Sequence, residues 1–364
     1  MSHVPRTVRP STAPLLLAAG LVLSACQEPV VLTDTAPPPP EVINDTAGVS
    51  PGVAEATNAY TLLSERPDRL VAELPNRMVI VAQSVPTAPV VSVQAWVKTG
   101  SLYEQEHVGA GLSHFLEHLV SGGTTTNRTE AQSTATLGRI GAQTNAATSL
   151  DTVRYYINTT SAHTATAVDL LSDWMQNNVV LQSEYERERD VIQSEFSMGQ
   201  GDPGRIHWKL TQQARFADTP THPGAHPTIG YLDEFLTVSR DELYDFYRRM
   251  YVPNNMVFVV VGDIDPPQVI EQVAALWGDV PTGELPELSF PVAPPAETTG
   301  PVVVEGVAAI TRPRVRLLWP GVRLGGEHDY ALDLLAGVLG RVVERVDRRD
   351  ELAVVAQLAH QPGR

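Results

Sequence analysis

The pentapeptide His-Phe-Leu-Glu-His at residues 114–118 constrains the fold of this chain more than any other segment. Residues four apart lie on one face of a helix, so in a helix His114 and His118 both reach one metal ion. Glu117 lies beside that face, close enough to contact water on the metal. Neutral imidazole is a zinc ligand, and zinc leaves one position open for water in catalytic sites. The segment therefore predicts a helix that carries a zinc hydrolase site, with the usual His-Glu-x-x-His order reversed.

The flanking residues favour a short apolar helix over residues 108–120. Its apolar positions recur at helical spacing, and glycines follow where a helix C-cap is expected. These positions are Leu112, Phe115, Leu116 and Leu119, followed by Gly122 and Gly123. An alternative stays open, in which two hydrogen-bonded histidines flank a surface glutamate and bind no metal.

A catalytic zinc ion usually needs a third protein ligand, and a second predicted helix over residues 183–198 offers one. Glu188 and Glu195 are seven residues apart, close to two turns, so they share a face. Glu195 lies between Ile192 and Phe196, where a carboxylate is costly unless it is paired or bound to a metal. Glu195 is therefore the candidate third ligand.

The same helix carries further expectations. We expect Ser183 to cap its N-terminus and Val191 to face inward together with other apolar residues. Glu184 and Glu186 are interpreted as solvated surface charges.

At this point the chain resembles the pitrilysin and insulinase-like zinc metallopeptidases, which include the mitochondrial processing peptidases and bacterial relatives. Their pattern is H-x-x-E-H followed by a distant glutamate ligand, and here 76 residues separate His118 from Glu195. The resemblance covers roughly residues 55–285 as a full domain and continues more weakly to the C-terminus. Further matching segments follow in order: Gly100-Ser101 through Glu104, Asn145 to Ser149, Glu188 to Glu195, His226 to Gly230, Tyr251 to Met256 and Val261 to Asp263.

The resemblance implies a role for each matched residue. His114, His118 and Glu195 would bind one zinc ion per chain, and Glu117 would be the general base. Glu188 would support catalysis near the metal. The implied fold is α+β, a metallopeptidase domain whose antiparallel or mixed sheet packs on helices, followed by an incomplete second domain of the same kind. The implied activity is endopeptidase hydrolysis of peptides or small proteins.

Several interpretations of individual residues stay open. Glu188 is alternatively a surface glutamate paired with a neighbouring arginine. Asn145 and Ala146 match an edge strand that binds peptide substrate by backbone pairing, and alternatively form an ordinary strand. Ligand type alone does not distinguish zinc from manganese or cobalt.

The N-terminus predicts secretion. Arg6 and Arg9 precede an apolar run over residues 13–23 that is too short to span a bilayer well and has the length of a signal-peptide core. Leu-Ser-Ala-Cys ending at Cys26 resembles a bacterial lipoprotein signal, with Cys26 as the lipidated residue. Gln27, rather than an aspartate, follows this cysteine. In Gram-negative bacteria, this resemblance implies sorting to the outer membrane, with the protein facing the periplasm. The alternative is an ordinary signal peptide that happens to contain this cysteine, the only one in the chain.

Composition excludes some partners. With 43% hydrophobic and 19% charged residues, the chain has ordinary globular composition. The formal charge is −16, and it becomes −18 without residues 1–25, which carry two arginines and no acidic residue. This charge argues against nucleic acid and anionic lipid as partners of the globular part. The rest of the chain has no run of about 18 or more apolar residues, so the leader is the only predicted membrane element.

The sequence also predicts the order of elements. Prolines and glycines over residues 281–300 indicate a linker, and the Gly-rich turn and substrate-binding Arg and Tyr of the family's second domain are not found beyond it. The alternative to an active peptidase is therefore a catalytically silent scaffold subunit, or a subunit whose partner chain supplies a complete second domain.

The predicted divisions are a signal peptide (1–25), a disordered Pro-rich tether (26–52), a catalytic domain (53–280), the linker (281–300) and a partial second domain (301–364). Strands are expected over residues 77–83, 90–98, 152–159, 257–261, 302–307 and 315–319, and further helices over 129–140, 164–178, 239–250, 266–277 and 330–339.

Overall fold

The computed structural model describes residues 59–290, 303–310, 314–320, 325–339, 343–346 and 353–358. The predicted signal peptide and the tether, with Cys26, lie outside the described residues, as does the second half of the predicted linker. In the described part of the chain, no helix has both the length and the hydrophobicity that a bilayer-spanning segment needs.

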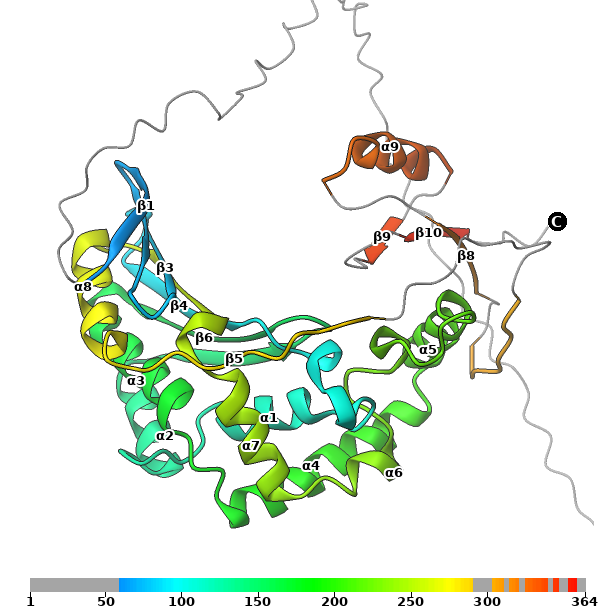
Figure 1. Cartoon of the computed structure of the whole chain (residues 1–364), viewed down its shortest axis with the longest axis horizontal. Helices are drawn as coiled ribbons and strands as arrows, with labels where there is room; N and C mark the ends of the chain where they lie inside the picture. Colours follow the sequence, from blue (N-terminus) through cyan, green and yellow to red (C-terminus); the bar gives the residue numbers. More distant parts are fainter. Residues whose placement is uncertain are drawn as a thin grey trace, which may run out of the picture. The chain divides into compact units, whose positions relative to one another are not determined.

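A mixed seven-stranded sheet organises residues 61–262, in the order β1-β2-β3-β7-β4-β6-β5 (Figure 1). Strand β7 pairs in parallel with β3, and the other neighbouring strands are antiparallel. The chain thus returns to the middle of the sheet after its helices, which confirms the expected α+β class. The strands are β1 (Thr61–Arg66), β2 (Arg69–Glu73), β3 (Val79–Ser84), β4 (Val90–Val97), β5 (Gln143–Thr148), β6 (Val153–Thr160) and β7 (Met256–Gly262).

The central strands alternate between a buried face and a half-buried face. In β4, Val91, Val93 and Ala95 are buried and the residues between them are not. In β7, Phe258 and Val260 are likewise fully buried. Side chains alternate across a strand, so this pattern directs one face of the sheet into the core.

The helices α1, α3 and α7 lie on one side of this sheet (Figure 1). Two tryptophans anchor the packing: Trp174 on α3 and Trp277 on α8 have no exposed surface. Their indole N–H groups donate to Ser133 and Ser172, which satisfies both buried donors. The α-helices are α1 (Leu112–Val120), α2 (Glu130–Arg139), α3 (Thr164–Asn177), α4 (Gln182–Gln200), α5 (Pro203–Arg215), α6 (Leu232–Phe235), α7 (Arg240–Met250) and α8 (Pro266–Trp277), and the short 3₁₀ helices are η1 (Ser101–Tyr103), η2 (Gln105–His107), η3 (Ser161–His163), η4 (Pro223–Ala225) and η5 (Pro253–Asn255).

Three expectations about α4 are wrong. The helix begins at Gln182 after Leu181, so Ser183 lies inside the first turn and does not cap it. Val191 is 42% exposed, because Ile192 takes the core-facing position. Glu184 is buried, since the loop after α1 brings Thr124 against it: the Thr124 hydroxyl and N–H donate to its carboxylate at 2.6 and 3.2 Å.

A second, three-stranded antiparallel sheet has the order β8-β10-β9 and is accompanied by helix α9. Its elements are β8 (Val315–Pro320), α9 (Asp329–Leu339), β9 (Val343–Val346) and β10 (Ala353–Leu358). The strand expected over residues 302–307 is wrong for residues 303–307, which form no regular structure. Val303 and Val307 are 72% and 94% exposed, and β-branched residues form a strand only where a partner or a packing surface exists.

Candidate metal centre

Helix α1 presents its polar residues along one side. Leu112, Phe115 and Leu116 are fully buried, while His114 and His118 are half-buried on another face. The helix is shorter than expected: it begins only at Leu112, after a left-handed residue, Gly111, and ends before Gly122, also left-handed. The two imidazoles lie one turn apart, with ring centroids separated by 4.8 Å.

Helix α4 packs against α1 and brings its carboxylates to the histidines. Tyr185 on α4 stacks on Phe115 of α1, with ring centroids 5.2 Å apart, and Ile192 is fully buried. Phe196 packs against Phe235 at 5.5 Å. These apolar contacts fix the turns of α4 that carry Glu188 and Glu195.

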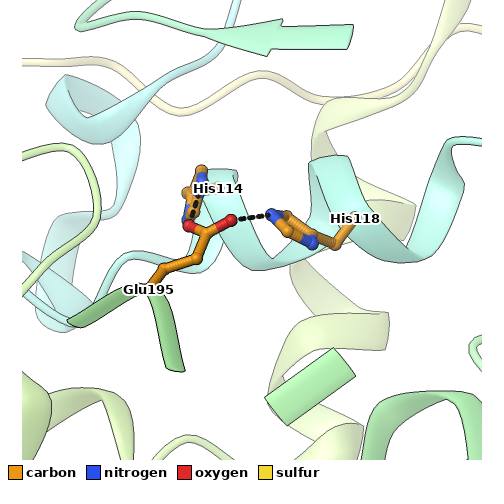
Figure 2. Close-up of side chains that lie close together, drawn as sticks. All are labelled: His114, His118 and Glu195. Atoms are coloured by element: carbon orange, nitrogen blue, oxygen red, sulfur yellow. Dashed lines mark ion pairs between the residues drawn. The ribbon is translucent and has the colours of Figure 1, made fainter. Parts of the chain in front are cut away.

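His114, His118 and Glu195 converge, as Figure 2 shows. Glu195 Oε2 lies 3.7 Å from His114 Nε2, and Oε1 lies 3.8 Å from His118 Nε2. One ligand atom from each residue lies within 4.8 Å of the others, and among the described residues no other group of three His, Cys, Asp or Glu side chains comes as close together. Zinc bonds of about 2.0–2.2 Å in tetrahedral geometry place neighbouring ligand atoms about 3.4 Å apart, so the group fits a zinc ion with little adjustment.

Glu188 does not belong to that group but contacts one of its members. Its Oε2 lies 3.2 Å from His118 Nδ1, and its Oε1 accepts a 3.1 Å bond from Arg187. The surface pairing with an arginine and the contact near the metal group therefore both occur. Because Nδ1 of His118 is occupied, Nε2 is the nitrogen left to face Glu195.

The pKa values of the two histidines move in opposite directions. Burial lowers the pKa of His114 to about 4, with further lowering by the positive charges of His118 and Arg205. Burial also lowers the pKa of His118, but the Glu188 hydrogen bond and nearby carboxylates outweigh it and raise the pKa overall. The His118 hydrogen bond in turn lowers the pKa of Glu188. His114 is thus neutral near pH 7, as a metal ligand must be.

Glu117 points to the strand next to the helix. Its Oε2 accepts a 2.6 Å hydrogen bond from the hydroxyl of Thr148, the last residue of β5. Burial raises the pKa of Glu117, although the Thr148 hydrogen bond and the His118 charge partly offset the increase. A carboxylate whose pKa is raised toward neutrality is a stronger proton acceptor than an exposed one.

Among the described strands, β5 lies at an edge of the sheet and pairs only with β6. Asn145 is exposed and Ala146 is half-buried. The Asn145 side chain accepts the N–H of Ala146 at 2.9 Å. An edge strand beside a metal group offers backbone groups to an extended peptide.

Two residues that bond Glu117 or the start of α1 received no role from the sequence. Thr148 belongs to a segment singled out only by its resemblance, and nothing in its type indicated a bond to Glu117. Glu104 also belongs to a resembling segment, and it is fully buried where its carboxylate meets the start of α1. Thr148 lies 31 positions from Glu117, and Glu104 lies nine positions from Ser113. Local sequence patterns do not reveal such contacts.

Two family models match the chain. The model described as insulinase (peptidase family M16) matches residues 79–222, and the model described as peptidase M16 inactive domain matches residues 237–359. The chain belongs to peptidase family M16. The first match contains the whole candidate metal group, and the second spans α7, β7 and α8 as well as the three-stranded sheet.

Relatives within this family are named as zinc proteases. An uncharacterized zinc protease of Mycobacterium leprae is 32% identical over 276 residues, which are 73% of this chain and 59% of that protein. A probable mitochondrial-processing peptidase subunit beta of Arabidopsis thaliana is 27% identical over 234 residues, which are 64% of this chain and 43% of that protein. The chain thus spans less than two thirds of the length of these relatives. The zinc protease relatives and the His-His-Glu group together fit the zinc site of M16 peptidases.

The fold is shared with solved M16-like structures. The periplasmic protease PqqL from Escherichia coli superposes with a TM-score of 0.65 at 20% identity, covering 83% of this chain and 36% of that one. At this identity the likeness concerns the fold alone.

Proposed function

We propose that this chain is a zinc-dependent endopeptidase. One observation carries the proposal: Nε2 atoms of two histidines and the carboxylate of Glu195 converge, with Glu117 adjacent to His118 on the same helix. His114, His118 and Glu195 are the proposed zinc ligands and leave one coordination position open. Membership in peptidase family M16 supports peptide bonds as the target.

When bound, zinc supplies Lewis-acid polarisation of water and of the scissile carbonyl. Glu117 takes a proton from the attacking water and delivers it to the nitrogen of the leaving amine. The Thr148 hydroxyl holds Glu117 Oε2, so the other oxygen of the carboxylate is available for that proton. Glu188 fixes the ring orientation of His118 by accepting from Nδ1.

The proposed substrate is an extended peptide that adds to the open edge of β5. Asn145 and Ala146 are the proposed contacts, in which backbone pairing gives affinity and side-chain pockets give selectivity. A formal charge of −16 favours basic or neutral peptides over acidic ones.

The proposed location is the bacterial cell envelope. The Leu-Ser-Ala-Cys sequence supports an outer-membrane lipoprotein anchored at Cys26, with a multi-acyl anchor because a single chain binds only marginally. The proposed divisions at residues 25, 52, 280 and 300 place the catalytic domain away from the bilayer on a Pro-rich tether.

A second candidate function is a catalytically silent subunit of a two-chain peptidase. Residues 237–359 match a model named for an inactive domain, and one relative is named as a subunit. In that case a partner chain supplies a complete second domain.

A comparison of zinc-loaded wild type with Glu117→Gln tests the proposal. We expect one zinc ion per chain in both proteins, and cleavage of a mixed peptide library by the wild type only. The variant should lose at least about a hundredfold in rate, the usual contribution of a general base. Glu186→Gln is the matched control, since Glu186 is exposed on α4 and accepts a hydrogen bond from Gln182, one turn before it on the same helix. A wild type that binds zinc but cleaves no peptide would favour the silent subunit.

A further inference from the structure

Glu104 is a fully buried carboxylate whose hydrogen bonds go to backbone amides. Oε1 accepts from the N–H of Ser113 at 2.9 Å, and Oε2 accepts from the N–H of Gly111 at 3.1 Å. In the described part of the chain it forms no ion pair with a basic side chain. Burying a carboxylate without a neighbouring cation is costly. The burial of Glu104 therefore needs a structural reason.

The start of α1 supplies that reason. The first N–H groups of a helix have no partner within the helix, and a side chain at the N-cap usually accepts one of them. Here the N-cap is Gly111, which has no side chain and adopts a left-handed φ of 74°. A Cβ at this position would lie 2.3 Å from the carbonyl oxygen of Ile229, so the close packing requires glycine. Glu104 replaces the missing cap from seven residues upstream.

The segment that carries Glu104 is itself fixed to the sheet. The N–H groups of Ser101 and Leu102 donate to the carbonyls of Ser149 and Leu150, just after β5. Gly100 packs so closely on this turn that a Cβ would lie 2.5 Å from Ser149 O. Glu104 therefore ties the first turn of α1 to the end of the edge strand.

That turn carries His114, which directly follows Ser113. The helix has only nine residues, and helix ends fray when their terminal groups are unsatisfied. His118 lies one turn further on and has its own contact with Glu188. Of His114 and His118, His114 is thus the one whose position depends on the start of the helix.

We propose that Glu104 is a positioning residue of the metal centre, which holds the first turn of α1 so that His114 Nε2 meets Glu195. This inference rests on the proposed zinc ligands. The substitution Glu104→Gln keeps the shape but replaces one acceptor oxygen with an NH₂ group, which would face a backbone N–H donor. The first turn would then lose one of its two attachments.

The zinc dissociation constant, measured by chelator competition, tests this in the full chain. We expect Glu104→Gln to weaken zinc binding about tenfold to a hundredfold, the range for residues that orient metal ligands. Glu242→Ala is the matched control, because it removes the capping box that Glu242 closes with Ser239 on α7, and among the described residues Glu242 has no contact with His114, His118 or Glu195. The control should lower the melting temperature and leave zinc affinity unchanged.

A double-mutant cycle separates positioning from general stability. If Glu104 acts through His114, Glu104→Gln should have little further effect on zinc affinity in a His114→Ala background. An equal loss in both backgrounds would overturn the inference. If Glu104→Gln does not fold, Glu104→Asp carries the test, since it keeps the carboxyl group, shortens the reach and should weaken zinc binding by a smaller factor.

The outcomes are distinguishable from failure of the proposed function. A wild type that binds no zinc would overturn both proposals. Equal zinc affinity of the wild type and the folded Glu104 variants would overturn this inference alone.

Discussion

The hydroxyl of Thr148 donates a 2.6 Å hydrogen bond to Oε2 of Glu117. Thr148 ends the edge strand β5, and Glu117 lies on the helix that carries both histidines. The strand proposed to bind the substrate and the proposed general base are therefore in direct contact. A peptide added to β5 would lie along the element that orients the base.

Thr148→Val should lower kcat while leaving zinc content unchanged. A hydrogen bond to a charged group contributes about 1.5–3 kcal/mol, which corresponds to about a tenfold to hundredfold fall in rate. The bond also lowers the pKa of Glu117, so its loss should raise that pKa further and move the acidic limb of the pH–rate profile to higher pH. Steady-state kinetics across pH on a cleaved peptide measure both effects.

Thr148→Ser is the control for this variant, because serine retains the hydroxyl. It should keep most of the wild-type rate and the wild-type acidic limb. A valine variant with unchanged kcat and an unchanged profile would show that Thr148 does not orient the base.

Glu188→Gln should weaken zinc binding about tenfold to a hundredfold. The neutral amide accepts the His118 Nδ1 hydrogen bond less strongly than the carboxylate at 3.2 Å, so the ring becomes a less basic ligand. Metal titration of the purified variants measures the change. Glu186→Gln, on the exposed side of the same helix, should bind zinc like the wild type. Identical affinities for the two variants would assign Glu188 to the surface pairing with Arg187.

Zinc affinity should depend on the titration of one histidine. In the metal-free protein burial holds the pKa of His114 near 4, whereas carboxylates raise the pKa of His118 above its usual value. Zinc must displace a proton from His118 but not from His114. We expect the affinity to fall about tenfold per pH unit below the pKa of His118, which corresponds to one proton. Chelator competition from pH 5 to 8 measures the slope, and a slope of two protons would show that both histidines are protonated.

The regular elements with strong periodicity were predictable from sequence. The helix expected over residues 266–277 has those bounds, alternation indicated β4, and a valine-rich run indicated β7. Part of the arrangement around the metal group also follows from the sequence, because glycines follow the end of α1 and a seven-residue spacing puts two glutamates on one face of α4. The hairpin β1–β2 was not predicted, since its alternation is weak and several of its residues are exposed.

The remaining errors come from long-range contacts. Glu184 belongs to a run of charged residues and was interpreted as solvated, but Thr124, 60 positions away, buries it and satisfies both oxygens. The roles of Glu104 and Thr148 were missed for the same reason, since their hydrogen-bond partners lie on other elements. Periodicity and propensity describe one segment at a time, so a buried polar group becomes predictable only when the packing of its neighbours is known.

The most direct test of the proposed metal centre is the position of zinc in a crystal of the zinc-loaded protein, located by anomalous diffraction at the zinc absorption edge. We predict one strong peak about 2.0–2.2 Å from Nε2 of His114, Nε2 of His118 and a carboxylate oxygen of Glu195. Glu188 should contact His118 Nδ1 and not the ion. A peak at another cluster of side chains, or one coordinated by Glu188 in place of Glu195, would contradict the account.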